Sequence, residues 1–290
     1  MFKRQTSGSV ICPSCQQLVS VKVKACPYCD RPNPGMWGYG KILRRLGVDL
    51  GFLQIVTWGC LTLYILTLLV DIGGIRNDGA LNLLSPSGRG LFLFGASGSL
   101  PVFTLGRWWT VLSSGWLHGS LIHIAFNLVW IHQLIPNVAK IYGAARLVII
   151  YTVAAIGGAF LTSFVAHYLG WLPDILDGAN ITIGASGAIF GLFGALVAYG
   201  QIHRDPGVLQ QAWTYAVVLF VLGFLMSRVD NWGHLGGFLG GYAVCYLPWL
   251  NPRSPETQYH LFGAIACLAL TLLSIGVSII TGLEFFALFK

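Results

Sequence analysis

Two residues of this chain, Ser186 and His234, have side chains suited to nucleophilic catalysis and lie in otherwise apolar stretches. A serine hydroxyl becomes a useful nucleophile when an adjacent base removes its proton. A neutral imidazole can act as that base and then protonate the leaving group. Both residues have glycine neighbours, in Gly-Ala-Ser-Gly at 184–187 and Gly-His-Leu-Gly-Gly at 233–237. The pair is therefore a candidate nucleophile and general base.

The composition and the spacing of the charges indicate which secondary-structure elements hold Ser186 and His234. Hydrophobic residues make up 55% of the chain and charged residues 9%, against about 25% charged residues in a soluble domain. The formal charges leave seven uncharged windows of at least 21 residues, and a helix needs about 20 residues to cross the hydrocarbon core. The windows are 50–70, 108–139, 147–173, 178–203, 206–227, 231–252 and 257–283. We therefore expect an all-α polytopic membrane protein with seven transmembrane helices within 51–290. Buried helices of a large soluble protein would need a charged outer layer that this sequence lacks.

The orientation follows from the basic residues, which favour the cytoplasmic side. Before the first window stand Lys3, Arg4, Lys22, Lys24, Arg31, Lys41, Arg44 and Arg45. Lys140, Arg146, Arg204 and Arg253 adjoin connections on the same side, whereas the opposite connections contain Asp174 and Asp177, and Arg228 with Asp230. We expect an uncleaved first span in the cell (plasma) membrane, since no apolar signal region precedes it. The N-terminus would be cytoplasmic and the C-terminus extracytoplasmic. The net charge of +7 then requires no nucleic-acid partner.

This topology brings polar residues from three distant segments to one depth. The second, fourth and sixth spans all begin at the outer surface. Near those starts lie His118, His123 and Asn127, then Ser186, then His234. Structural polar groups would be scattered through the bilayer, and intramembrane polar residues are functional candidates. We infer one site a few helical turns below the outer face.

Small residues spaced four apart favour contact between the serine and histidine helices. Gly187 and Gly191 form one such pair and Gly237 and Gly241 another, and faces of this kind let membrane helices approach closely. Because the uncharged windows contain no Asp or Glu, we expect a Ser–His dyad without a buried acid. The nearest acid, Asp230, stands at the outer edge of its window.

A tetrahedral oxyanion would need hydrogen-bond donors. His123 and Asn127 are four residues apart, and so about 40° apart around one helix. His118 is about 140° from His123 and either caps the helix start or holds the preceding loop. The backbone N–H of Ser186 is a further donor near a helix N-terminus.

Each of these polar side chains also has a structural interpretation, namely a hydrogen bond to its own or a neighbouring helix. A second Gly-Ala-Ser-Gly at 95–98 lies outside any window, so we do not assign Ser97 as the nucleophile.

Together these motifs resemble the rhomboid family of intramembrane serine proteases. The likeness rests on residues 184–187, on Asp-Asn-Trp-Gly-His-Leu-Gly-Gly at 230–237 and on the spacing of His118, His123 and Asn127, and it covers about residues 51–290. It implies a six-helix core plus one C-terminal transmembrane helix, near 261–283. It also implies cleavage of transmembrane segments of other proteins near the outer face, without a catalytic cofactor.

The resemblance also implies roles for individual residues. Ser186 would be the nucleophile and His234 the general base, while His123, Asn127 and Gly184, with His118 as a further candidate, would stabilise the oxyanion. The alternative is a non-proteolytic relative that binds or escorts membrane proteins, which would be expected to lack Ser186 or His234. A transporter would have polar groups near mid-membrane and internal repeats, and we find neither.

Two departures from the family pattern concern the surroundings of the site. Members often have Trp-Arg nine and eight residues before the first histidine of the second span, where this chain has Trp109 and Thr110 preceded by Arg107. We therefore expect different bonding within the long first connection, 71–116, which the resemblance implies is partly embedded in the membrane. Four residues after the serine many members have a tyrosine that packs on the catalytic histidine. Phe190 keeps the ring but not the hydroxyl, so we expect the packing to survive and any hydrogen bond of the hydroxyl to be lost.

The N-terminal segment contains a second kind of site. Cys12 and Cys15, then Cys26 and Cys29, form two Cys-x-x-Cys pairs, a spacing that suits a closed tetrahedral structural zinc site. Disulfides are disfavoured in a reducing cytoplasm, and iron is the competing metal. We expect a zinc ribbon at 1–33 and a linker at 34–50. A cytoplasmic partner of the ribbon would be consistent with this arrangement.

Overall fold

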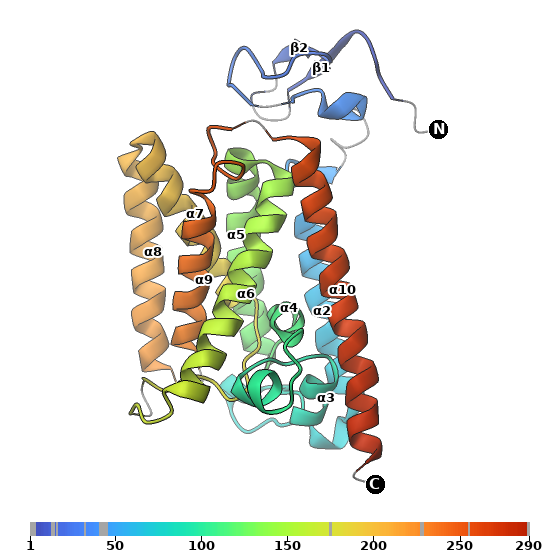
Figure 1. The fold of residues 1–290 in the computed structure, drawn as a ribbon, viewed down its shortest axis with the longest axis vertical. Helices are drawn as coiled ribbons and strands as arrows, with labels where there is room; N and C mark the ends of the chain where they lie inside the picture. Colours follow the sequence, from blue (N-terminus) through green and yellow to red (C-terminus); the bar gives the residue numbers. More distant parts are fainter. Residues whose placement is uncertain are drawn as a thin grey trace.

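The computed structural model describes residues 4–12, 15, 17–31, 33–40, 46–173, 176–226, 229–254 and 256–288. Within these residues, long helices form a membrane domain with a small sheet at one end of it (Figure 1). The long helices are α2 (Phe52–Val70), α5 (Leu121–Tyr142), α6 (Ala144–Tyr168), α7 (Ser186–His203), α8 (Pro206–Leu225), α9 (Asn231–Val244) and α10 (Gln258–Ala287). Of the residues used to predict orientation, Lys3, Lys41, Arg44, Arg45, Asp174 and Arg228 lie outside the described residues.

The shorter elements lie before α2 and in the connection from α2 to α5. Strands β1 (Ser9–Ile11) and β2 (Leu18–Ser20) pair antiparallel, with Val10 opposite Val19. The other short elements are η1 (Met36–Gly38), η3 (Ile72–Gly74), η4 (Ala80–Asn82), α3 (Gly88–Leu93), η5 (Leu100–Thr104), α4 (Thr110–Ser113) and η6 (Ser114–Trp116). In Figure 1 the sheet lies at the top and the 71–116 connection at the bottom, so the two occupy opposite ends of the helices.

The long helices fall in or overlap the seven uncharged windows, as expected. Five of them, α2, α5, α6, α8 and α10, are long and apolar enough to cross a membrane. Helices α7 and α9, which carry Ser186 and His234, have 18 and 14 residues. At about 1.5 Å per residue α9 is about 21 Å long, shorter than the hydrocarbon core of about 30 Å. The uncharged window of α9 is longer than the helix, and its residues from 245 to 250 form turns. The two site helices are therefore held mainly by their protein neighbours.

Glycines bring α6, α7 and α9 into backbone contact. A Cβ added at Gly237 would overlap the carbonyl oxygen of Gly187, and one at Gly241 would overlap that of Gly191. A Cβ at Gly158 of α6 would likewise meet the carbonyl oxygen of Gly233. Small residues allow such approach between membrane helices. The predicted small-residue pairs thus lie in the interface that joins the serine and histidine helices.

Exposure separates the centre of the domain from its edge. In the most apolar window of α6, 61% of the residues are buried inside the protein, whereas in α8 only 17% are. Helix α8 packs mainly on α7 and touches α9. Helix α10 contacts α6, α3 and α4, and so lies beside the first connection. The structure thus has a six-helix core with α10 added at the side where the connection 71–116 packs.

Helix starts near the site are defined by short polar side chains. The Ser120 hydroxyl accepts the N–H of His123 at the start of α5, and an Asp230 oxygen accepts the N–H of Gly233 at the start of α9. Such residues satisfy backbone donors that lack a partner within the helix. Ser120 rather than His118 therefore caps α5, which leaves His118 in the loop just before the helix.

Candidate active site

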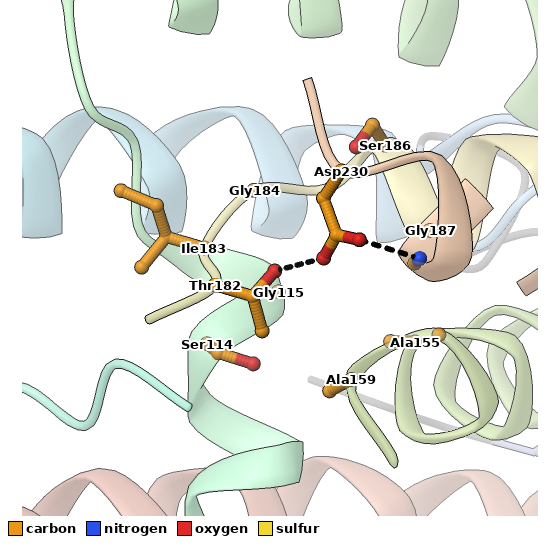
Figure 2. A pocket seen from close by; sticks show the side chains of 12 residues that line it. Ser114, Gly115, Ala155, Ala159, Thr182, Ile183, Gly184, Ser186, Gly187 and Asp230 are labelled. Carbon is orange, nitrogen blue, oxygen red and sulfur yellow. Dashed lines mark hydrogen bonds between the residues drawn. The ribbon is translucent and has the colours of Figure 1, made fainter. Parts of the chain in front are cut away.

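Ser186 is the first residue of α7, and a loop that runs beside the first connection leads to it. Gly184, two residues earlier, has a φ of 120°, a conformation that glycine adopts at little steric cost. Its N–H donates to the carbonyl oxygen of Ser114 at 3.0 Å. Figure 2 shows Gly184 and Ser186 beside a small pocket whose walls also include α6 and the start of α9. The loop thus leaves the Ser186 hydroxyl at the edge of a cavity.

His234, the fourth residue of α9, is buried with 8% of its surface exposed. Its ring stacks on that of Phe190, with centroids 4.1 Å apart and planes 13° apart. Phe190 comes four residues after Ser186, and residues so spaced share a helix face. The imidazole therefore lies against the face of α7 that carries the serine. This contact is the packing that the ring of Phe190 was predicted to keep.

No hydrogen bond joins Ser186 to His234 within the described part of the chain, and His234 Nδ1 has no hydrogen-bond partner there. Catalytic hydrogen bonds are often long before substrate binds and tighten in the complex. Among these residues no carboxylate is bonded to the imidazole, because the Asp230 oxygens accept from Thr182 and Gly233 instead. The Ser–His dyad stays a prediction.

His123 faces Gly184 from the start of α5. A Cβ added at Gly184 would lie 2.7 Å from His123 Nε2 and 3.8 Å from Ser186 Oγ. Because the N–H of Gly119 donates to His123 Nδ1 at 3.3 Å, that nitrogen is unprotonated in the neutral ring and Nε2 carries the proton. His123 therefore directs an N–H donor toward the space next to the Ser186 hydroxyl.

Asn127 lies one turn further along the same helix and is buried, with 2% of its surface exposed. Its Nδ2 donates to the carbonyl oxygen of His123 at 2.8 Å. An amide nitrogen has two hydrogens, so one donor of Asn127 is not used by this bond. Its Oδ1 has no partner among the described residues. The structure thus brings Asn127 beside His123, with its amide partly bonded to its own helix.

His118 is completely buried in the loop before α5. Its ring lies edge-on to that of His123, with centroids 5.2 Å apart. Neither ring nitrogen has a partner of hydrogen-bond geometry in the described chain. His118 therefore packs edge-on against His123, in the loop just before α5.

Asp230 and Thr182 form a polar contact that the sequence did not indicate. Asp230 Oδ2 accepts the Thr182 hydroxyl at 2.6 Å (Figure 2). Its Oδ1 accepts the N–H of Gly233 at 2.8 Å. Burial raises the pKa of Asp230, and these two hydrogen bonds oppose the rise. Nothing distinguished Thr182 from the other small polar residues of its uncharged window, so spacing alone could not have found it.

The first connection is held to its surroundings by Arg107 and Trp109. The Arg107 guanidinium donates to the carbonyl oxygens of Phe92, at 3.2 Å, and of Ser278 in α10, at 2.9 Å. It also lies over the Phe92 ring, 4.0 Å from the centroid. Trp109 Nε1 donates to the Ser278 hydroxyl at 3.1 Å. In this chain the seventh long helix therefore supplies acceptors that hold the connection.

The four N-terminal cysteines converge as the spacing predicted. The sulfur atoms of Cys12, Cys15, Cys26 and Cys29 all lie within 4.8 Å of one another. Cys12 is 3.7 Å from Cys29, and Cys15 is 3.6 Å from Cys26. A tetrahedral site with Zn–S distances of about 2.3 Å has sulfurs about 3.8 Å apart, whereas a disulfide needs about 2.05 Å. The four thiols fit a structural zinc ion and are not paired as disulfides.

The sequence model of the Rhomboid domain matches residues 105–251, which is half of the chain and includes every residue of the candidate active site described above. This chain belongs to the rhomboid family. The family and the long apolar helices together make it a multi-pass membrane protein.

Several curated rhomboid proteins are similar to this family member. The Rhomboid protease GluP of Bacillus subtilis (strain 168) is 31% identical over 184 residues, which is 62% of this chain and 33% of that protein. RHOMBOID-like protein 4 of Arabidopsis thaliana is 28% identical over 192 residues, 62% of this chain and 46% of that protein. Rhomboid-like protease 3 of Toxoplasma gondii is 29% identical over 195 residues, 65% of this chain and 70% of that protein. The chain spans less than half the length of the first two.

Proposed function

We propose that this rhomboid is an intramembrane serine endopeptidase that cleaves transmembrane segments of other membrane proteins. Ser186 would be the nucleophile and His234 the general base. The observation that carries the proposal is the His234 ring stacked on Phe190, one helical turn from Ser186 on the same face of α7. The names of the Bacillus and Toxoplasma relatives, a rhomboid protease and a rhomboid-like protease, support the same activity.

The mechanism requires proton transfers that this geometry accommodates. His234 removes the Ser186 proton as Oγ attacks the scissile carbonyl carbon, and a tetrahedral oxyanion forms. The protonated imidazole then donates to the leaving amine, which releases one product and leaves an acyl-serine. Water, deprotonated by His234, hydrolyses that ester and restores the hydroxyl. No carboxylate is bonded to His234 among the described residues, so the imidazolium would be stabilised without a buried acid.

Donors for the oxyanion would come from two elements. His123 Nε2–H faces Gly184 beside the serine, and Asn127 has an amide hydrogen not used by its bond to His123. The backbone N–H of Ser186, at the start of α7, would add a donor whose helix dipole favours negative charge. Preorganised donors act strongly in a site that excludes water. His118, whose ring lies edge-on to that of His123, would support this arrangement.

The cleavage face follows from the positions of the helix starts. Ser186 and His234 lie at the N-terminal ends of α7 and α9, and His123 at that of α5. With the N-terminus cytoplasmic and the C-terminus extracytoplasmic, these starts face the extracytoplasmic side, most simply of the plasma membrane. Reporter fusions at each terminus would test this. An extracytoplasmic N-terminal reporter would reverse the assigned face.

The N-terminal ribbon would bind one structural zinc ion, with Cys12, Cys15, Cys26 and Cys29 as ligands. All four positions of a tetrahedral zinc ion would be filled by thiolates, so the ion would serve folding rather than catalysis. A small domain of this kind has too little core to fold without such support. The ribbon could then present a surface to a cytoplasmic partner.

Coexpression with a tagged single-span substrate tests the activity. Wild type should release a cleaved fragment, whereas Ser186→Ala and His234→Ala should release none. Matched controls are Thr214→Ala, which removes an exposed hydroxyl of α8, and His132→Ala, which removes an exposed imidazole of α5. Cleavage that persists in either site variant would refute the dyad. Capture of substrates without cleavage by the wild type would favour the alternative of a binding or escorting protein.

A further inference from the structure

Asp230 contacts both segments that carry the proposed catalytic residues. It is the residue just before α9, four positions ahead of His234. Its Oδ1 accepts the Gly233 N–H at 2.8 Å, which is an ordinary helix cap. Its Oδ2 accepts the Thr182 hydroxyl at 2.6 Å, and Thr182 stands four positions ahead of Ser186. One carboxyl group therefore links the loop of the serine to the helix of the histidine (Figure 2).

Thr182 is itself fixed on its other side. Its backbone exchanges two hydrogen bonds with Ser97, of 3.1 and 2.8 Å, across an isolated antiparallel bridge. Two residues later Gly184 donates to Ser114. The loop thus rests on the first connection through backbone bonds, and the side chain of Thr182 remains to bond elsewhere. This also gives the second Gly-Ala-Ser-Gly, at 95–98, a structural role next to the site.

A second bond between the same segments is more peripheral. Trp232 Nε1 donates to the carbonyl oxygen of Leu176 at 2.8 Å, in an exposed position. The Thr182–Asp230 bond is shorter and borders the pocket beside Ser186. The bond between Thr182 and Asp230 is therefore the better placed to control the distance between the two reacting side chains.

We propose that Thr182 and Asp230 are positioning residues that hold the Ser186 loop and the His234 helix in catalytic register. This inference rests on the proposed function. Asp230 is not a third catalytic residue, because His234 Nδ1 has no partner among the described residues. Its effect would be geometric, and small displacements of reacting groups can cost about a hundredfold in rate.

Paired variants separate this link from the helix cap. Thr182→Val removes the hydroxyl and keeps the branched shape, while Thr182→Ser restores a hydroxyl. Asp230→Ser keeps a side chain that can cap α9 but is too short to reach Thr182. Asp205→Ser is the matched control, because Asp205 caps α8 in the same manner at the other end of the helices.

The readouts are kcat and KM on a transmembrane peptide in detergent, the labelling rate of Ser186 by a fluorophosphonate, and the thermal midpoint. Thr182→Val and Asp230→Ser should lower kcat and labelling by about tenfold or more with KM nearly unchanged. Thr182→Ser should recover most of the rate, and Asp205→Ser should match wild type in rate.

Two results would overturn the inference and are distinguishable from each other. If Thr182→Val lowers the thermal midpoint but keeps the kcat of wild type, the bond serves stability alone. If the wild type neither cleaves nor is labelled, or Ser186→Ala cleaves like wild type, the proposed dyad itself fails and the positioning role fails with it.

Discussion

The ring of Phe190 lies face to face with the imidazole of His234, 4.1 Å away between centroids. The stack holds the plane of an imidazole whose Nδ1 has no hydrogen-bond partner among the described residues. In an acid-assisted triad a carboxylate would set that orientation. Here packing against α7 does so, which couples the histidine directly to the helix that begins with Ser186.

The stack predicts that the flat face of residue 190 matters more than its volume. Phe190→Leu keeps an apolar side chain of similar size, so we expect a thermal midpoint within a few degrees of wild type and a kcat lower by about tenfold. Phe190→Tyr should retain the activity. The measurement is kcat on a transmembrane peptide in detergent. A control is Phe262→Leu on the exposed face of α10, and equal activity of the two leucine variants would contradict the prediction.

Gly184 offers a test of the serine loop. Its φ of 120° disfavours any side chain, and a Cβ there would lie 2.7 Å from His123 Nε2. Gly184→Ala should therefore strain the loop and displace the imidazole, with a loss of kcat of about a hundredfold. Gly276→Ala in α10 is the matched control, since a Cβ at that position meets nothing within 4 Å. Comparable kcat values for the two alanine variants would show that the loop tolerates the change.

The sequence predicted the helices because charge cannot easily enter the hydrocarbon. Uncharged windows located α2, α5, α6, α7, α8, α9 and α10, and the predicted fold class and family are confirmed. Windows locate helix ends poorly, however. Residues 245–250 carry no charge, yet they form turns, because an uncharged stretch is not obliged to be helical.

Pairings between distant segments could not be predicted in this way. Ser97 bonds to Thr182 across 85 positions, and Arg107 to Ser278 across 171. Neither pair follows a periodicity or a charge pattern in the sequence. The cysteines behave differently, because two Cys-x-x-Cys pairs bring the ligands of one metal into each other's reach within a short segment.

Replacement of His123 should weaken stabilisation of the transition state rather than binding of the substrate. Its Nδ1 accepts from Gly119, so its Nε2–H would donate to the oxyanion. His123→Ala should lower kcat by about a hundredfold or more with KM changed little, as expected for a donor used mainly in the transition state. His132→Ala on the same helix removes an exposed ring bonded to Leu128 and should retain activity. A rise in KM alone would assign His123 to substrate binding.

The cysteine cluster predicts one zinc ion per chain. Metal analysis of the purified full chain should give about one equivalent, and Cys12→Ser or Cys29→Ser should lower it toward zero because three thiolates bind zinc less tightly. Cys267→Ser, far along the sequence in α10, should leave the zinc content unchanged. Iron in place of zinc, or no metal in the wild type, would contradict the assignment of the ligands.

The bond from Arg107 to Ser278 indicates that α10 contributes to the stability of the protein. Its guanidinium bonds to the carbonyl oxygens of Phe92 and Ser278 and lies over the Phe92 ring, and the residue is 5% exposed. Arg107→Gln should cost about 1–3 kcal/mol of stability, because buried acceptors lose a charged donor. Arg89→Gln is a suitable control, since Arg89 is exposed and lies over Phe286 at 4.8 Å. Thermal midpoints in detergent distinguish the Arg107 variant from the Arg89 variant.

The Arg107 variant should also lose activity, because the connection that Arg107 stabilises pairs with the loop of Ser186 at Thr182. An Arg107 variant as stable as the Arg89 variant would show that α10 does not hold the connection through this residue.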